Sequence, residues 1–150
     1  KEPFYDLDYL NFSRADAVSA NYSPQTARDL VADQELDGVP KRSIVLRSST
    51  QIRCPLHLSA PTQLELALGF WGTGTGTAEI GIVEEGQPKT TLHERKVTGG
   101  TGARWTPVSL DLSPYVGRVI GLELRAARAT QGGRVAFGEP IADHEKFLIR

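Results

Sequence analysis

The amino-acid sequence predicts an all-β fold, an antiparallel β-sandwich made of two sheets. Short apolar runs with a period of two recur at nearly regular spacing, and Gly, Pro or Ser bounds each run. No sustained helical stripe lies between them. Alternation of this kind buries one face of each strand, and a succession of such strands is typical of a sandwich or a barrel.

The clearest alternation lies at residues 63–70, where four large apolar side chains share one face: Leu64, Leu66, Leu68 and Phe70. Shorter apolar runs predict further strands at 44–46, 52–58, 80–82, 108–112, 120–124 and 135–137. About seven strands with one buried face each are enough to build the two inner surfaces of a sandwich.

The chain of 150 residues has the size of a single domain. Apolar residues before the first clear strand follow no sustained period, so we expect residues 1–38 to form an N-terminal extension that wraps the sandwich. The β-sandwich domain itself is expected over residues 39–150. Because the chain starts without Met and ends in a strand-like run, we expect it to be a piece of a longer protein.

Composition argues against two classes of partner. Lys and Arg number 17 against 18 Asp and Glu, so the chain lacks the basic surplus that neutralises nucleic-acid phosphates. No apolar run approaches the roughly 20 residues of a membrane-spanning helix. We therefore expect neither nucleic-acid binding nor membrane insertion. The single cysteine, Cys54, cannot form an internal disulfide.

Glycine-rich loops mark one end of the predicted sandwich. Consecutive antiparallel strands reverse direction, so alternate loops fall at the same end. Counting from the strand at 63–70 places the loops 71–77, 98–105 and 127–133 together, and the connections 85–88 and 113–117 at the opposite end. The first group would carry the candidate ligand-binding residues Trp71, Thr73, Thr75, Arg104, Trp105, Arg128 and Gln131, with Arg134 as a further candidate.

These residue types suit a carbohydrate. The C–H face of a sugar ring stacks on an indole, while its hydroxyls take hydrogen bonds from neighbouring polar groups. Arginine would also suit a carboxylate or a sulfate. The alternative interpretation is that Trp71 and Trp105 cap the core, the commoner role for an aromatic residue at a strand end, and that the glycines only turn corners.

Three stretches carry a family resemblance: Ser43-Ile44-Val45-Leu46 with Ser49 and Ile52, Arg104-Trp105 followed by residues 108–118, and Ala136-Phe137-Gly138-Glu139-Pro140-Ile141. The middle stretch is the most specific, because a tryptophan precedes a strand that ends in Asp-Leu-Ser and then an aromatic-x-Gly turn. Over about two-thirds of its length the chain resembles the galactose-binding-like jelly-roll accessory domains found beside bacterial sulfatase, glycosyltransferase and other envelope-associated modules.

The resemblance implies a jelly roll with a noncatalytic accessory role in a bacterial envelope or secreted protein, located in the periplasm or outside the cell. Similar domains usually carry Trp where this chain has Phe137, which argues against a sugar platform at that position. Such domains often hold a structural calcium ion, and oxygen ligands are available at Glu35, Asp37, Asp143 and Glu145. Their spacing matches no calcium-binding loop, so no cofactor is predicted.

No motif in the sequence predicts catalysis. The Gly-Thr-Gly-Thr-Gly run at 72–76 lacks the Gly-Lys-Ser/Thr of a phosphate-binding loop. The three histidines are too far apart in the sequence to match the ligand spacing of a zinc site: His57, His93 and His144. The sequence also contains no nucleophile motif and no recognisable pair of catalytic carboxylates. We therefore predict that the chain is not an enzyme.

Two functions fit these observations. The first is a noncatalytic module, carbohydrate-binding through the three loops, of a larger bacterial envelope or secreted protein. The alternative is a protein–protein interaction or assembly domain with no glycan ligand, which would dock a neighbouring domain through a sheet face or edge. That alternative predicts a contiguous apolar patch on one sheet and a closed, packed loop end.

Overall fold

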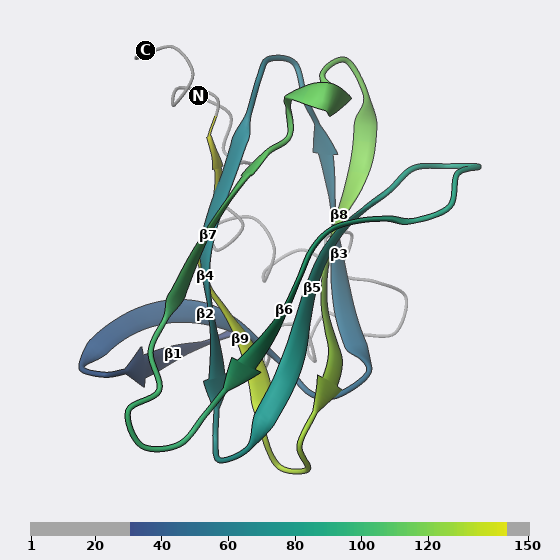
Figure 1. The fold of residues 1–150 in the computed structure, drawn as a ribbon. Helices are drawn as coiled ribbons and strands as arrows, with labels where there is room; N and C mark the ends of the chain where they lie inside the picture. Colours follow the sequence, from purple (N-terminus) through teal and green to yellow (C-terminus); the bar gives the residue numbers. More distant parts are fainter. Residues whose placement is uncertain (1–30, 144–150) are drawn as a thin grey trace.

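The computed structural model describes residues 31–143, which form a sandwich of two antiparallel sheets (Figure 1). This architecture confirms the predicted fold class. The rest of the expected N-terminal extension, and the candidates His144 and Glu145, lie outside the described residues. No helix within the described range is long and apolar enough to cross a membrane.

The larger sheet has five strands in the order β1-β2-β9-β4-β7. Their bounds are β1 Val31–Leu36, β2 Val39–Leu46, β9 Arg134–Asp143, β4 Gln63–Trp71 and β7 Thr106–Asp111. The smaller sheet has the order β3-β8-β5-β6, with β3 Thr50–His57, β8 Val119–Ala129, β5 Thr75–Val83 and β6 Thr90–Thr98. Successive strands such as β4 and β5 lie in different sheets, so the chain repeatedly crosses from one sheet to the other.

Each strand predicted from the sequence is present, and two more complete the sheets. β1 lies within the stretch expected to be an extension and pairs with β2, so the five-stranded sheet begins before residue 39. The turn between them has only two residues, Asp37 and Gly38, both with positive φ of 51° and 77°. Positive φ at both positions is the geometry of the tight hairpin turn that an Asp-Gly pair favours.

The core lies between the two sheets and follows the predicted alternation. Leu64, Leu68 and Phe70 from β4 are almost completely buried, as are Ile80 on β5 and Leu122 on β8. Phe137 is also fully buried in this core. Because it is buried, the Phe137 ring does not offer a stacking surface to a sugar, which agrees with the sequence-based expectation.

The end opposite the glycine-rich loops holds the last part, residues 111–117, of the most specific stretch of the family resemblance. The main-chain N–H of Ser113 donates to Asp111 Oδ1 at 2.9 Å, and a short 3₁₀ turn, η3 Ser113–Tyr115, follows. Gly117 has a φ of 85° and donates its N–H to the Leu58 carbonyl at 2.7 Å. These contacts make the Asp-Leu-Ser and aromatic-x-Gly signature a folding element of this end.

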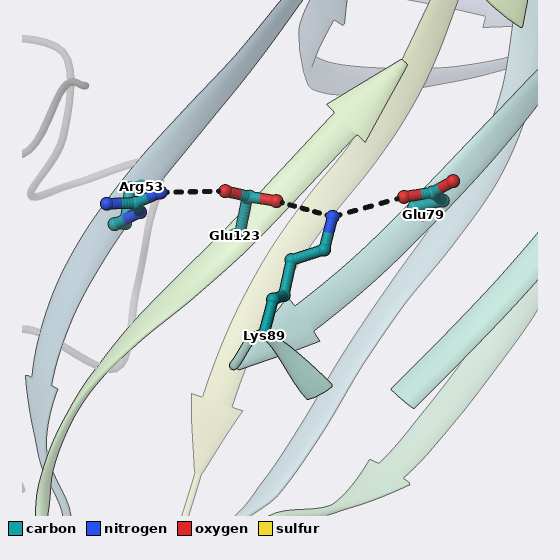
Figure 2. A network of polar contacts seen from close by, with 4 residues as sticks. All are labelled: Arg53, Glu79, Lys89 and Glu123. Carbon is teal, nitrogen blue, oxygen red and sulfur yellow. Dashed lines mark hydrogen bonds and ion pairs between the residues drawn. The ribbon is translucent and has the colours of Figure 1, made fainter. Parts of the chain in front are cut away.

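A chain of charged residues crosses the outer face of the four-stranded sheet (Figure 2). Glu123 on β8 is only 3% exposed, and its two oxygens accept hydrogen bonds from Arg53 Nη2 and Lys89 Nζ, each at 3.0 Å. Lys89 also contacts Glu79 at 3.4 Å. Glycines at 81 and 121 leave space for the aliphatic stems of Lys89 and Arg53 to lie flat across the sheet.

The two cations determine the protonation state of Glu123. Burial raises the pKa of this carboxyl, but the hydrogen bonds and charges of Lys89 and Arg53 outweigh burial and hold the pKa below its usual value of 4.5. The folded-state pKa is thus lower than that of the unfolded chain. The contribution of Glu123 to stability is therefore complete above pH 4.5 and is lost as the pH falls through the lower, folded value.

We expect Glu123→Gln to lower the free energy of unfolding at neutral pH by about 1–3 kcal/mol, because Arg53 and Lys89 lose their shared carboxylate while their partial exposure limits the cost. Urea unfolding at neutral pH and again well below pH 4.5 measures the effect. The difference from wild type should shrink at the lower pH. Glu85→Gln, a change of an exposed acid in the β5–β6 loop, is the control. A difference independent of pH would contradict this account.

Candidate functional site

The three glycine-rich loops meet at one end of the sandwich, the lower end in Figure 1. Main-chain hydrogen bonds join them: Gly99 N–H donates to the Gly74 carbonyl at 2.8 Å and Gly100 N–H to the Gly72 carbonyl at 3.0 Å. Thr130 N–H donates to the Thr75 carbonyl at 2.9 Å. The counting of strand reversals is confirmed. We call this region, formed by residues 47–49, 71–75, 99–103 and 130–134, the loop end.

The turn 47–49 between β2 and β3 also belongs to the loop end, although the sequence analysis did not include it. Ser49 N–H donates to the Ala126 carbonyl at 2.7 Å, and Ser48 Oγ accepts a hydrogen bond from Ala129 N–H at 3.1 Å. Counting strand reversals backwards from β4, as well as forwards, would have placed this turn at the same end.

Two of the glycines are required for the loops to approach one another. A Cβ added at Gly99 would collide with the main-chain carbonyl of Gly72, and one added at Gly133 would enter the ring of Phe70. Glycine in these loops therefore does more than turn corners, because it permits main-chain contact between loops that are distant in the sequence.

Trp71 is the exposed aromatic residue of the loop end. It is the last residue of β4, it is 46% exposed, and it pairs across the sheet with Arg134, the first residue of β9. The guanidinium carbon of Arg134 lies 5.8 Å from the centre of the indole ring, within the range of a cation–π interaction. The pair presents an aromatic surface and a cation side by side.

A pocket of about 370 Å³ lies between the β2–β3 turn and the β8–β9 loop. Its lining consists of Arg47, Ser48, Ala129, Thr130, Gln131, Gly132, Gly133 and Arg134. Arg134 connects this pocket to Trp71. A hydroxyl, an amide and two guanidinium groups can thus reach a ligand that also contacts an indole ring, which is the combination of groups that recognises a polar ring.

The structure divides the predicted ligand-binding residues into two groups. Trp71, Thr73 and Gln131 are exposed at the loop end. Thr75 also lies there, but its main chain is engaged in the loop contacts, since its N–H donates to Thr130 Oγ1 at 2.9 Å. Arg128 lies within β8, paired with Thr77, instead of in the following loop, because the strand continues to Ala129.

Arg104 and Trp105 point away from the pocket and hold the β1–β2 hairpin. The Trp105 indole N–H donates to the Val39 carbonyl at 2.8 Å, and Arg104 Nε lies 3.2 Å from Asp37 Oδ2. A Cβ at Gly69 or Gly138 would come within 3.1 Å or 3.0 Å of the Trp105 ring, so the ring lies directly on the outer face of the five-stranded sheet. Trp105 is therefore half-buried and fixes the hairpin to the sheet.

A second hollow of about 370 Å³ lies beside Trp105 on that outer face. It is lined by Lys41, Glu65, Leu66, Ala67, Trp105, Pro107, Gly138, Glu139 and Ile141. Lys41 and Glu139 form an ion pair across it at 3.4 Å. Sequence reasoning missed this hollow, because its residues come from four strands whose order in the sheet is not readable from the alternation.

The described acidic residues do not form a metal site. No three His, Cys, Asp or Glu side chains of the described range are grouped to hold a metal ion. Asp37, one of the considered calcium ligands, is paired with Arg104. The buried carboxylate Glu123 is enclosed by its two cation partners, which leaves it a structural role.

Comparison with known proteins shows the fold. No protein-family model matches the chain, and no curated protein matches its sequence. Among solved structures it resembles the carbohydrate-binding module CBM36 in complex with calcium and xylotriose, with a TM-score of 0.51, 10% identity, and coverage of 75% of this chain and 92% of that one.

Two further structures share the sandwich. TmCBM61 in complex with β-1,4-galactotriose has a TM-score of 0.51 and 14% identity, covering 96% of this chain and 99% of that one. The CBM22-1 xylan-binding domain of Paenibacillus barcinonensis Xyn10C has a TM-score of 0.53 and 13% identity, covering 75% and 77%. At these identities the likeness establishes the jelly-roll β-sandwich as the fold of this chain.

We expect Trp105→Phe to loosen the β1–β2 hairpin, because phenylalanine keeps an aromatic ring but removes the N–H that bonds to Val39. The cost should be about 1 kcal/mol of local stability. Amide hydrogen exchange should become faster around residues 36–41 and stay unchanged in β5 and β8. Trp71→Phe, at the exposed tryptophan, should leave the hairpin exchange as in wild type. Unchanged exchange around Val39 in Trp105→Phe would contradict the anchoring role.

Proposed function

We propose that this chain is a noncatalytic carbohydrate-binding module and that it binds glycan at the loop end. The observation that carries this proposal is Trp71, which is 46% exposed beside a pocket lined by hydroxyl, amide and guanidinium groups. Covering a large aromatic surface that is in water at a strand end is favourable for a ligand that binds there. A sugar ring provides an apolar face for the indole and hydroxyls for the pocket.

The solved structures of similar fold support this class of function, since the three described above are a CBM36 module with xylotriose, TmCBM61 with galactotriose and a xylan-binding domain. The stretches of sequence resemblance suggest the setting. We place the module in a larger bacterial envelope or secreted protein, of the kind that carries accessory domains beside sulfatase or glycosyltransferase modules.

The loop end is a better candidate than the hollow beside Trp105. The Trp105 N–H is already bonded to Val39, and its ring covers two glycines of the sheet. Trp71 instead has nearly half of its surface in water. The interaction-domain alternative predicts a contiguous apolar patch, and its candidate is the hollow beside Trp105, whose lining includes Leu66, Pro107 and Ile141.

The test is a glycan-array screen followed by isothermal titration calorimetry with the glycans that bind, a readout that does not depend on Trp71 itself. Trp71→Ala should weaken binding about tenfold or more, because the stacking surface is lost. Val119→Ala, which truncates an exposed side chain at the opposite end, should bind as wild type. Wild-type protein that binds no glycan, or Trp71→Ala that binds with full affinity, would contradict the proposal.

A further inference from the structure

The pocket at the loop end is lined by two cations and by no acid. Arg47 and Arg134 line the pocket, and no Asp or Glu is among the residues that line it. Within the described part of the chain neither of these arginines forms an ion pair. Arg134 lies over the neutral ring of Trp71.

Most other cations of the sandwich do have acidic partners. These ion pairs are Lys41–Glu139, Arg42–Asp33, Arg53–Glu123, Lys89–Glu123, Lys89–Glu79, Arg104–Asp37 and Arg118–Glu84. The formal charge of the chain is only −1, so the free guanidinium groups do not reflect a general excess of positive charge. The positive charge in the pocket comes from the local placement of Arg47 and Arg134.

Two more exposed cations lie next to the loop end on the four-stranded sheet. Arg128 on β8 and Lys96 on β6 pair with Thr77 of β5 from its two sides, which places both cations in one row across the sheet. The strand ends next to the loop end thus carry two further positive charges on this face. A ligand approaching this end meets an attractive potential if it carries negative charge.

From this arrangement we infer that the glycan bound at the loop end is acidic, and that Arg47 and Arg134 bind its carboxylate or sulfate groups. A guanidinium group matches the geometry of either anion and can donate two parallel hydrogen bonds to it. The hydroxyl of Ser48 and the amide of Gln131 line the same pocket and suit the uncharged hydroxyls of the sugar, whereas the Thr130 hydroxyl is already bonded to the main chain of Thr75. This inference rests on the proposed glycan-binding function and specifies the ligand class.

A glycan fits better than another polyanion. Nucleic-acid binding sites combine extended basic grooves with several stacking aromatics, whereas the loop end presents a compact pocket and one exposed indole. A single acidic sugar unit matches that size. The other polyanions are therefore used as a contrasting arm of the test.

The experiment compares ligands that differ only in charge, using isothermal titration calorimetry. Oligogalacturonate is compared with its methyl ester, in which the same rings lack the carboxylate charge. Sulfated carrageenan oligosaccharides are compared with the same oligosaccharides after removal of their sulfate groups. Inorganic polyphosphate and a single-stranded DNA oligonucleotide test for binding of any polyanion. The variants are Arg134→Gln and Arg47→Gln, with Arg118→Gln at the opposite end as the matched control, and thermal unfolding checks that each variant is folded.

We expect the acidic member of at least one pair to bind ten or more times more tightly than its neutral partner. The carboxylate and sulfate arms show which anion is preferred. Arg134→Gln and Arg47→Gln should each remove most of that difference, and Arg118→Gln should not. Equal binding of the acidic and neutral members would overturn this inference and leave glycan binding intact.

Three other results would also overturn it: polyphosphate or DNA binding as tightly as the acidic glycan, an acidic preference unaffected by both pocket variants, or binding of none of the ligands. The last result, together with a negative glycan array, would overturn the proposed function as well.

Discussion

Contact between the main chains of the glycine-rich loops fixes the geometry of the loop end. The bonds from Gly99 and Gly100 to the β4–β5 loop bring together segments that lie about 25 residues apart in the sequence. Without this approach, which any side chain at Gly99 would block, Trp71 and the β6–β7 loop would not occupy a common surface. The pocket beside Trp71 depends on the same kind of contact, since Thr130 N–H donates to the Thr75 carbonyl and a side chain at Gly133 would enter the ring of Phe70.

The two tryptophans divide two roles between them. The Trp105 indole N–H donates to the Val39 carbonyl, and its ring packs on the outer face of the five-stranded sheet. Trp105 therefore holds the β1–β2 hairpin in place. Trp71 ends a strand at the loop end and keeps nearly half of its surface in water beside Arg134. The sequence left two roles open for the tryptophans, packing and ligand binding. Trp105 has the packing role, and Trp71 is the candidate for ligand binding.

The alternation of apolar residues predicted the strands that bury one face. It did not predict β1 and β6, where the alternation is absent. β6 is an edge strand with only Val97 buried, so its sequence shows no period of two. β1 is also an edge strand, and the Asp37-Gly38 pair was the remaining indication of its hairpin. The loop positions followed from strand reversal, but the separation of Arg104 and Trp105 from the pocket depended on a tertiary contact with Val39 that no local pattern encodes.

The central claim is that an acidic glycan binds at the loop end, and NMR titration of labelled protein with such an oligosaccharide tests it most directly. The two indole N–H signals distinguish the two surfaces. The account predicts shifts at the Trp71 indole and at the amides of residues 47–49 and 130–134, with the Trp105 indole unmoved. Shifts centred on the Trp105 indole and on the amides near Lys41 and Ile141 would place the ligand in the hollow on the five-stranded sheet and contradict the account.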